Sequence, residues 1–409
     1  MNVLHIVAGD LSGGAARGAY WLHTGLKELG VDSKVFSNSK LTLGDDSVVS
    51  TIQTTKGKAS NMIRGQLDDA LTLFYPKRKG IIFSTGIFGL DLTKIKEYHE
   101  ADIIHLHWIN AGFINIKHLK KIDKPIVWTI RDMWPMTGGC HYSMGCEEYK
   151  IACGKCEQLG SNSAYDLSKV ILNRKKKYLP KNIQIVGISN WLSAEAKKSV
   201  LFKNLDVITI SNNINTEAFF PVNKTTAKKN LSINTNKKII LVGSTNLKDH
   251  YKGFGKYLEA ISTLDNDKYF LAFFGNLDKE IADSLGFQYK YFGYLHDNIS
   301  LRLVYSCANV FVAPSLMEGF GKTLAESMAC GTPVVCFDAT GPKDIVTHKV
   351  DGYKSKAFES YDLANGIEWV LNAKNYDELC KNSRKKVLTQ FESVVVAKKY
   401  IALYEDILR

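Results

Sequence analysis

The amino-acid sequence predicts an α/β protein built from two doubly wound, Rossmann-like domains. The length of 409 residues exceeds that of one ordinary domain, and short apolar runs alternate with segments of helical periodicity along the chain. Such runs are typical of parallel strands that are buried on both faces. They are 3–8, 34–37, 102–107, 126–130 and 184–188 in the first half, and 239–243, 269–274, 289–292, 310–313 and 334–336 in the second.

The amino-acid composition predicts a globular protein with a substantial core. Hydrophobic residues make up 45% of the chain and charged residues 23%, which is enough apolar surface for a substantial core. The sequence holds no run of 18 or more apolar residues, so it predicts no membrane-spanning helix. The segment Met1–Ala8 lacks a basic leader and is followed at once by Asp10 and Gly13, which favours a core strand over a signal peptide and predicts a cytoplasmic protein.

The formal net charge of +12 favours acidic partners. Basic residues cluster at 77–79, 174–177, 197–198, 228–229 and 237–238. Two interpretations remain open: a solvated basic face, or peripheral docking on the anionic inner face of a membrane. The sequence shows neither a helix-turn-helix nor a basic strand interleaved with aromatic residues, so nucleic acid is not an expected partner.

Two features of the first hundred residues allow two interpretations each. Gly13 and Gly14, in the loop after the first strand, would let the backbone approach a ligand closely, but a tight turn explains them equally well. A helix expected over 56–75 carries an apolar stripe, which we expect to pack in the core, with a position on a membrane as the alternative. The stripe comprises Met62, Ile63, Leu67, Leu71 and Phe74.

Two histidines lie at the end of the strand over 102–107. His105 and His107 share one face of that strand, because strand side chains alternate with a period of two. They sit at the carboxyl edge, where open α/β sheets bind ligands. A functional role and a structural role in the core both remain open.

Four of the eight cysteines cluster in the spacing C-x5-C-x6-C-x2-C, namely Cys140, Cys146, Cys153 and Cys156. In a reducing cytoplasm, clustered thiols indicate a metal site rather than disulfides. Four thiolates could hold a structural zinc ion, with unbound thiols as the alternative. His141 is then a spare ligand or a polar group beside a substrate. The remaining cysteines, Cys307, Cys330, Cys336 and Cys380, have apolar neighbours and are expected in the core.

The stretch over 309–336 organises the second half of the chain. It is expected to form a strand, a loop with two glycines, a helix and a second strand. Glu318 and Glu326 flank the turn that opens the helix, whose N-terminal N–H groups attract anions. Carboxylates beside an anion site suit a ligand that also carries hydroxyl groups, as a sugar or a ribose does. Two surface glutamates on an ordinary strand–turn–helix are the alternative.

This stretch resembles the nucleotide-sugar motif of the retaining GT-B glycosyltransferases called family 4, or glycosyl transferases group 1. The E-x7-E spacing, the EGFG loop and the ACGTPVV tail carry the resemblance. It implies that Glu318 contacts the donor sugar and that Glu326 holds the nucleotide ribose. It also implies that four further residues bind the donor, namely Phe320, Gly321, Lys322 and Thr323.

The resemblance extends more weakly over nearly the whole chain. It implies an acceptor-side domain of residues 1–215 and a donor-binding domain of residues 216–391, which face each other across a cleft. The closing helix, 392–409, would cross back to the first domain. The Gly13–Gly14 loop would lie near the acceptor and the donor diphosphate.

Other positions match the family or depart from it. Lys252, before Gly253, matches the family's lysine and is expected to be the main cation for the donor phosphates. Ser244 stands where the family usually has arginine. Arg131 stands where it often has histidine, and a guanidinium cannot serve as a base. Asp132 matches and is expected to contact an acceptor hydroxyl, unless it caps a helix or pairs with Arg131.

These features predict a retaining glycosyltransferase with Glu318, Lys252, Asp132 and His107 as candidate catalytic residues. It would move a hexose-type sugar from a nucleotide diphosphate sugar, UDP rather than GDP, to a hydroxyl of a lipid-linked glycan. The expected setting is bacterial surface polysaccharide synthesis, such as O-antigen or other lipopolysaccharide, capsule or exopolysaccharide. No catalytic metal is expected, because no D-x-D motif ends a strand. The alternatives are a nucleotide-sugar 2-epimerase and a non-catalytic, zinc-stabilised sugar-binding protein.

Overall fold

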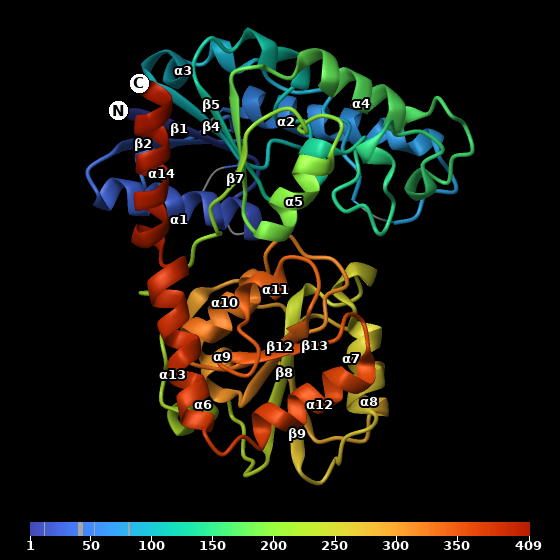
Figure 1. Cartoon of the computed structure of the whole chain (residues 1–409), viewed down its shortest axis with the longest axis vertical. Helices are drawn as coiled ribbons and strands as arrows, with labels where there is room; N and C mark the ends of the chain where they lie inside the picture. The colour runs from blue at the N-terminus through green and yellow to red at the C-terminus, as the bar shows by residue number, and fades with distance from the viewer. Residues whose placement is uncertain (12, 40–43, 53, 81) are drawn as a thin grey trace. The chain divides into compact units, whose positions relative to one another are not determined.

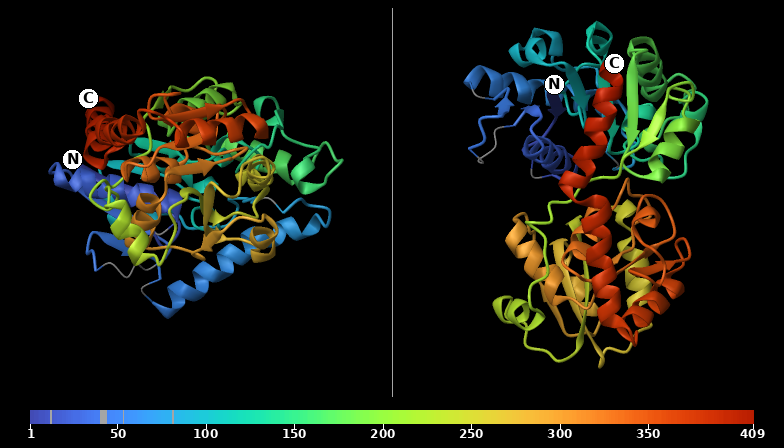
Figure 2. Two further views of the ribbon diagram at one scale, coloured as in Figure 1. Left: turned by 90° about the horizontal axis from the view of Figure 1, so that it is seen from below. Right: turned by 60° about the vertical axis from the view of Figure 1, so that its left-hand side comes forward.

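The computed structural model describes residues 1–11, 13–39, 44–52, 54–80 and 82–409. These residues form two compact units. Unit 1 comprises Met1–Ser211 with Val396–Arg409, and unit 2 comprises Asn212–Val395. Each unit holds a parallel sheet with helices on both of its faces (Figures 1 and 2). The predicted α/β class with two doubly wound sheets is confirmed.

Unit 1 is built on seven parallel strands in the order β3-β2-β1-β4-β5-β6-β7. The strands are β1 (Asn2–Val7), β2 (Asp32–Ser37), β3 (Val48–Ser50), β4 (Ile103–Leu106), β5 (Ile126–Ile130), β6 (Ile183–Gly187) and β7 (Val207–Thr209). The α-helices are α1 (Gly14–Glu28), α2 (Thr55–Ala70), α3 (Lys96–Glu100), α4 (Leu167–Tyr178) and α5 (Asn190–Lys198). Short 3-10 helices are η1 (Leu71–Phe74), η2 (Leu92–Lys94), η3 (Ile116–Lys121), η4 (Trp134–Met136), η5 (Glu148–Lys150) and η6 (Glu157–Leu159).

The C-terminal helix α14 (Ser393–Leu408), red in Figure 2, packs its last turns on the sheet of unit 1. Tyr400 and Tyr404 of α14 are buried in the cluster that Val3, Ile103 and Val127 of the strands also form. This apolar burial fixes the end of the chain to unit 1.

Unit 2 is built on six parallel strands in the order β10-β9-β8-β11-β12-β13. The strands are β8 (Lys238–Asn246), β9 (Tyr269–Asn276), β10 (Tyr289–Tyr291), β11 (Val310–Ala313), β12 (Val334–Phe337) and β13 (Gly352–Ser355). The α-helices are α6 (Lys224–Asn230), α7 (Phe254–Ile261), α8 (Lys279–Ser284), α9 (Asn298–Cys307), α10 (Lys322–Ala329), α11 (Pro342–Ile345), α12 (Ser360–Leu371) and α13 (Tyr376–Lys386). A 3-10 helix, η7 (His250–Lys252), and a π-helix, η8 (Val387–Phe391), complete the unit.

All ten predicted strands are present, with ends that differ by up to three residues. Three further strands, β3, β7 and β13, were not predicted. Each lies at the edge of its sheet and has only three or four residues, some of them partly exposed. A short edge strand carries no buried apolar run, so the pattern that identifies the central strands is missing.

The expectation that the stripe over 56–75 packs in the core is wrong. Asp68 is the one buried residue of α2, whereas Met62, Ile63 and Leu67 are 61%, 52% and 42% exposed, and Phe74 of η1 is 81% exposed. Within the described residues, no helix is long and apolar enough to cross a membrane.

Candidate functional site

Two of the predicted catalytic residues, Lys252 and Glu318, meet in unit 2. Lys252 ends η7, after β8, and Glu318 lies in the loop between β11 and α10. The Nζ atom of Lys252 is 2.6 Å from Oε2 of Glu318, and each side chain keeps 20% of its surface exposed. A carboxylate has several lone pairs, so Glu318 can accept hydrogen bonds from ligand hydroxyl groups while it holds Lys252 in place.

Backbone contacts fasten these two loops together. The backbone N–H groups of Leu316 and Met317 both donate to the carbonyl of Tyr251, over 2.9 and 3.2 Å. Gly253 has φ +67°, and a Cβ at this position would lie 1.9 Å from the carbonyl oxygen of Pro314. Only glycine allows this approach, which explains why a glycine follows the lysine.

Helix α10 begins four residues after Glu318. Gly321 precedes it with φ +105°, and Lys322 and Thr323 are half-buried in its first turn. The helix N-terminus adds partial positive charge close to the ion pair, as an anionic ligand requires. Phe320 is only 3% exposed and packs its ring edge-to-face on Phe391, so it offers a ligand its backbone rather than its ring.

Glu326 and Ser244 are both buried in unit 2. Glu326 has no exposed surface, and its Oε2 accepts a hydrogen bond of 3.0 Å from the hydroxyl of Tyr305. Its contact with a ribose therefore stays a prediction. Ser244 is 7% exposed, and its Oγ has no hydrogen-bond partner among the residues that the structure describes. A buried hydroxyl without a partner is costly, which makes Ser244 a candidate contact for a bound ligand.

In unit 1, Asp132 is held by three donors. Its Oδ2 lies 2.6 Å from Nδ1 of His141 and accepts from Nε1 of Trp108 over 2.9 Å. Its Oδ1 accepts from the backbone N–H of Trp134, also over 2.9 Å. The Nε2 of His141 lies 2.9 Å from Oγ of Ser84. The predicted residue Asp132 is thus one end of a polar chain whose other end, Ser84, the sequence did not indicate.

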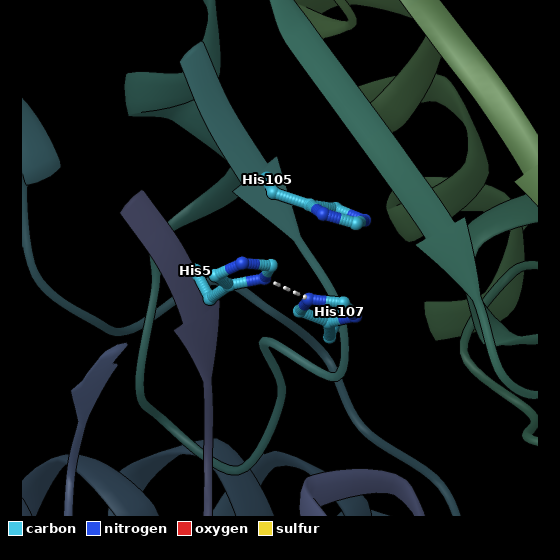
Figure 3. A group of neighbouring side chains, drawn as sticks. All are labelled: His5, His105 and His107. Carbon is cyan, nitrogen blue, oxygen red and sulfur yellow. Dashed lines mark hydrogen bonds between the residues drawn. The ribbon is translucent and has the colours of Figure 1, made fainter. Parts of the chain in front are cut away.

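The predicted residue His107 lies in a buried cluster with His5 and His105 (Figure 3). The Nδ1 of His5 is 2.9 Å from Nε2 of His107. Burial lowers the pKa of all three imidazoles well below the ordinary value, so they are neutral at pH 7. His107 is only 2% exposed, and its catalytic role stays a prediction.

The hydrogen bonds of these rings argue against a metal ion in this cluster, although the ligand nitrogens lie within 4.8 Å of one another. The rings of His105 and His107 are 4.0 Å apart at 33°, and those of His5 and His107 are 5.2 Å apart at 16° (Figure 3). The contact of His5 Nδ1 with His107 Nε2 is a hydrogen bond, so one of these two nitrogens carries a proton and offers no lone pair to a metal ion. A guanidinium nitrogen of Arg131 also lies 3.2 Å from Nδ1 of His107, and a cation there disfavours a second one.

The four clustered cysteines lie around one small cavity of unit 1. All four are free thiols, and burial raises the pKa of Cys140 to about 12 and that of Cys153 to about 11. Among the described residues, the histidine cluster is the one set of three or more ligands within 4.8 Å, so the sulfur atoms are neighbours without forming a closed set. The zinc site stays a prediction. Of the other cysteines, Cys307, Cys330 and Cys336 are buried as expected, and Cys380 is half-buried.

The glycine loop of unit 1 is exposed. Gly13 precedes α1, Gly14 begins it, and a Cβ at either position would meet nothing within 4 Å. Space is therefore available for a ligand, but these glycines are not forced by local packing. Ser12, within the predicted loop, lies outside the described residues.

Residues 223–387 match the family described as Glycosyl transferases group 1. A curated relative from Campylobacter jejuni, N,N'-diacetylbacillosaminyl-diphospho-undecaprenol alpha-1,3-N-acetylgalactosaminyltransferase, is 28% identical over 199 residues, 47% of this chain and 52% of that protein. The capsular polysaccharide biosynthesis glycosyltransferase CapM of Staphylococcus aureus is 30% identical over 26% of this chain and 28% of CapM. The chain thus spans about half the length of the first relative, and less of the second.

Solved structures resemble the fold along the chain. Sucrose-phosphate synthase from Thermosynechococcus elongatus aligns with a TM-score of 0.70 at 19% identity, covering 100% of this chain and 99% of that one. Anabaena HepE in complex with UDP and glucose aligns with a TM-score of 0.64 at 16% identity, covering 99% of each chain. The α/β fold of two Rossmann-like units is that of the GT-B glycosyltransferases, and residues 223–387 form a Glycosyl transferases group 1 domain.

Proposed function

We propose that the chain is a retaining glycosyltransferase of family 4. It transfers a hexose-type sugar from a nucleotide diphosphate sugar to a hydroxyl of a lipid-linked glycan, in bacterial surface polysaccharide synthesis. Unit 2 binds the donor, and unit 1 binds the acceptor. The observation that carries the proposal is the ion pair of Lys252 and Glu318 beside the N-terminus of α10, within the matched domain.

The chemistry of this site suits a sugar diphosphate. Lys252 and the N-terminus of α10 supply positive charge for the phosphates, while Glu318 accepts hydrogen bonds from sugar hydroxyls. In the transfer, the acceptor oxygen forms a bond to the anomeric carbon as the bond from that carbon to the diphosphate breaks. The diphosphate keeps the bonding electrons and takes the acceptor proton. Stabilising the charge that builds on the diphosphate lowers the barrier.

UDP is proposed as the donor nucleotide. Its support is that HepE, which shares the fold, has been solved in complex with UDP and with UDP-glucose. No catalytic metal is proposed, because Lys252 and the helix N-terminus already supply positive charge for the diphosphate.

A lipid-linked acceptor is proposed for two reasons. The relative from Campylobacter jejuni is named for an acceptor on diphospho-undecaprenol. In this chain, exposed apolar side chains of α2 and η1 lie among exposed basic residues, a combination that suits the surface of an anionic membrane. We therefore place the protein in the cytoplasm, peripherally bound to the inner face of the cell membrane.

The experiment combines donor binding with turnover. Thermal unfolding of the purified chain is measured with UDP, GDP and their sugars, and the expected result is the larger stabilisation by UDP compounds. Transfer is then measured with lipid-linked glycans and the donor that stabilises the chain. A new product from the donor alone would support the 2-epimerase instead. Donor binding without transfer, hydrolysis or isomerisation would support a non-catalytic sugar-binding protein.

A further inference from the structure

A cavity of about 720 Å³ lies within unit 1. Its wall combines apolar residues with polar ones, which include two cations, the acidic Asp69, two glutamines and the hydroxyl residues Thr72 and Ser84. The residues that matter here are Leu73, Ile82, Phe83, Trp108, Arg78 and Ser84. Trp108 is partly exposed, so part of its indole faces the open space.

Ser84 is the end of a relay of three side chains. Its Oγ lies 2.9 Å from Nε2 of His141, and Nδ1 of His141 lies 2.6 Å from Oδ2 of Asp132. The three residues are only 5%, 3% and 8% exposed. A carboxylate accepts hydrogen bonds, so Nδ1 of His141 is the donor to Asp132; in the tautomer with its proton on Nδ1, Nε2 accepts from Ser84 and lies 3.4 Å from Nδ2 of Asn110. The lone pairs of Ser84 Oγ can then accept a hydrogen bond from a hydroxyl group of a ligand in the cavity.

The backbone around Ser84 is fixed on both sides. Its N–H donates to the carbonyl of Gly139 over 2.9 Å, and its own carbonyl accepts from Nε1 of Trp134 over 2.8 Å. The next N–H, of Thr85, donates to Oδ2 of Asp68 in α2 over 3.1 Å. The main chain at Ser84 is therefore held in place at the wall of the cavity, and the contact with His141 orients its hydroxyl.

The order serine, histidine, aspartate is also that of many hydrolases. Those enzymes need N–H donors beside the nucleophile to stabilise an oxyanion. Here the N–H groups of Ser84 and Thr85 are both occupied, by Gly139 and Asp68. The relay is thus suited to accept a hydrogen bond from a hydroxyl group, not to cleave an ester.

We propose that this cavity binds the sugar acceptor, and that an acceptor hydroxyl donates its hydrogen bond to Oγ of Ser84. The sugar ring lies against Trp108, whose apolar face covers the carbon side of the ring. Ser84 touches the acceptor, while His141 and Asp132 are positioning residues that hold Ser84 in its accepting orientation. The inference rests on the proposed function for the reaction, but sugar binding by unit 1 is measurable without a donor.

The test uses octyl glycosides of glucose, galactose, mannose and N-acetylglucosamine as probes. Saturation-transfer NMR of the full chain is expected to show contact with the sugar ring protons. Affinity should fall by about 10-fold or more in Ser84→Ala and in His141→Gln, because one hydrogen bond or its orientation is lost. Ser84→Thr retains a hydroxyl and should restore most of the affinity.

Ser33→Ala is the matched control. Ser33 is a buried serine of unit 1 whose Oγ lies 2.7 Å from Nδ1 of His23, away from the cavity. This variant should bind the probes like the wild type. Equal binding by Ser84→Ala and the wild type, or no binding of any probe by the wild type, would overturn the inference.

Two further readouts separate this inference from the proposed function. Stabilisation by UDP compounds should be the same in Ser84→Ala, His141→Gln and the wild type, since the donor binds unit 2. In transfer assays, the two variants should raise the KM for the acceptor and leave the KM for the donor unchanged. If Ser84→Ala weakens probe binding but UDP compounds neither stabilise the chain nor react, the proposed function fails and the sugar site stands.

Discussion

The hydroxyl of Tyr404, on the last helix of the chain, lies 2.6 Å from Nδ1 of His105 on β4. The second nitrogen of His105, Nε2, lies 2.7 Å from the hydroxyl of Thr129 on β5. Thr129 in turn lies 2.7 Å from the hydroxyl of Tyr400. A continuous chain of polar contacts, buried in an apolar core, therefore fixes helix α14 in register on unit 1.

Tyr404→Phe should destabilise unit 1. The substitution leaves Nδ1 of His105 without its partner in a fully buried site, and such a loss costs ~1–3 kcal/mol. Urea unfolding followed by circular dichroism measures the difference. Tyr361→Phe is the control, because Tyr361 is 73% exposed and should change little. Equal midpoints for the two variants would contradict the structural role of the network.

Stability should fall as the pH falls below about 6.5. Burial lowers the pKa of His5, His105 and His107 well below 6.5 in the folded chain, and lowers that of His23 from 6.5 to about 4. The unfolded chain therefore takes up protons first. Each proton that the unfolded chain binds and the folded chain does not bind lowers the free energy of unfolding by ~1.4 kcal/mol per pH unit. For His23 this loss continues down to about pH 4.

Urea unfolding at pH 8, 7, 6 and 5.5 measures this loss. Midpoints should be nearly constant above pH 7 and should drop below it. His5→Asn should show a shallower drop, since one buried imidazole is removed, whereas the exposed His296→Asn should show the wild-type drop. Constant midpoints from pH 8 to 5.5 would contradict the assignment of neutral, buried histidines.

The central strands and the EGFG loop could be predicted from sequence because their signals are local. A buried run such as 310–313, and Gly321 with φ +105° just before α10, each reflect a constraint within a few residues. The Ser84–His141–Asp132 relay could not be predicted, because Ser84 has no local signal and meets His141 only through the paired segments around Phe83 and Cys140.

The prediction that the apolar stripe of α2 packs in the core is wrong for the opposite reason. Its apolar spacing was a genuine signal, but periodicity does not tell which surface will cover the stripe. The place of His5 in the histidine cluster could not be predicted either, because it depends on the pairing of β1 with β4, which sets His5 opposite His105. Strand register depends on the topology of the whole sheet, which a single strand does not reveal.

Variants of Lys252 and Glu318 should lose transfer in different ways. Lys252→Ala removes a cation from the donor phosphates and should weaken UDP binding as well as lower kcat by ~10²–10³-fold. Glu318→Gln keeps its size but loses charge, so it should lower kcat with a smaller effect on UDP binding. Initial rates and titration calorimetry with UDP measure both effects.

The control pair is Lys256 and Glu259, which form an ion pair on the surface of the same unit. Lys256→Ala should leave kcat and UDP affinity within about 2-fold of the wild type, because exposed ion pairs contribute little. A Glu318→Ala variant that retains near-normal transfer would overturn the assignment of the site.

Membrane binding should depend on the exposed apolar residues of α2 and η1. Met62 and Phe74 are 61% and 81% exposed, with Lys56, Lys58 and Lys77 exposed nearby in sequence. The double variant Met62→Asp with Phe74→Asp should bind vesicles rich in phosphatidylglycerol ~10²-fold more weakly, since it loses apolar burial and gains repulsion. Sedimentation with vesicles measures the binding.

Two comparisons make this test specific. Tyr361→Asp changes an exposed aromatic residue of unit 2 and should bind the vesicles like the wild type. Raising the salt concentration should weaken wild-type binding, because screening shortens the reach of the basic residues. Equal binding to phosphatidylglycerol and phosphatidylcholine vesicles would show that the basic residues have no part in it.

The cysteine loop should bind one zinc ion per chain. Cys140, Cys146, Cys153 and Cys156 already surround one cavity, and four thiolates meet the usual coordination number of structural zinc. Metal analysis of protein purified under reducing conditions should give about one zinc per chain, and Cys153→Ser should lower both the zinc content and the unfolding temperature. Cys336→Ser, in β12, is the matched control, because it removes a buried thiol without changing the zinc content. Wild-type protein with intact thiols and no zinc would show that the loop is held by packing alone.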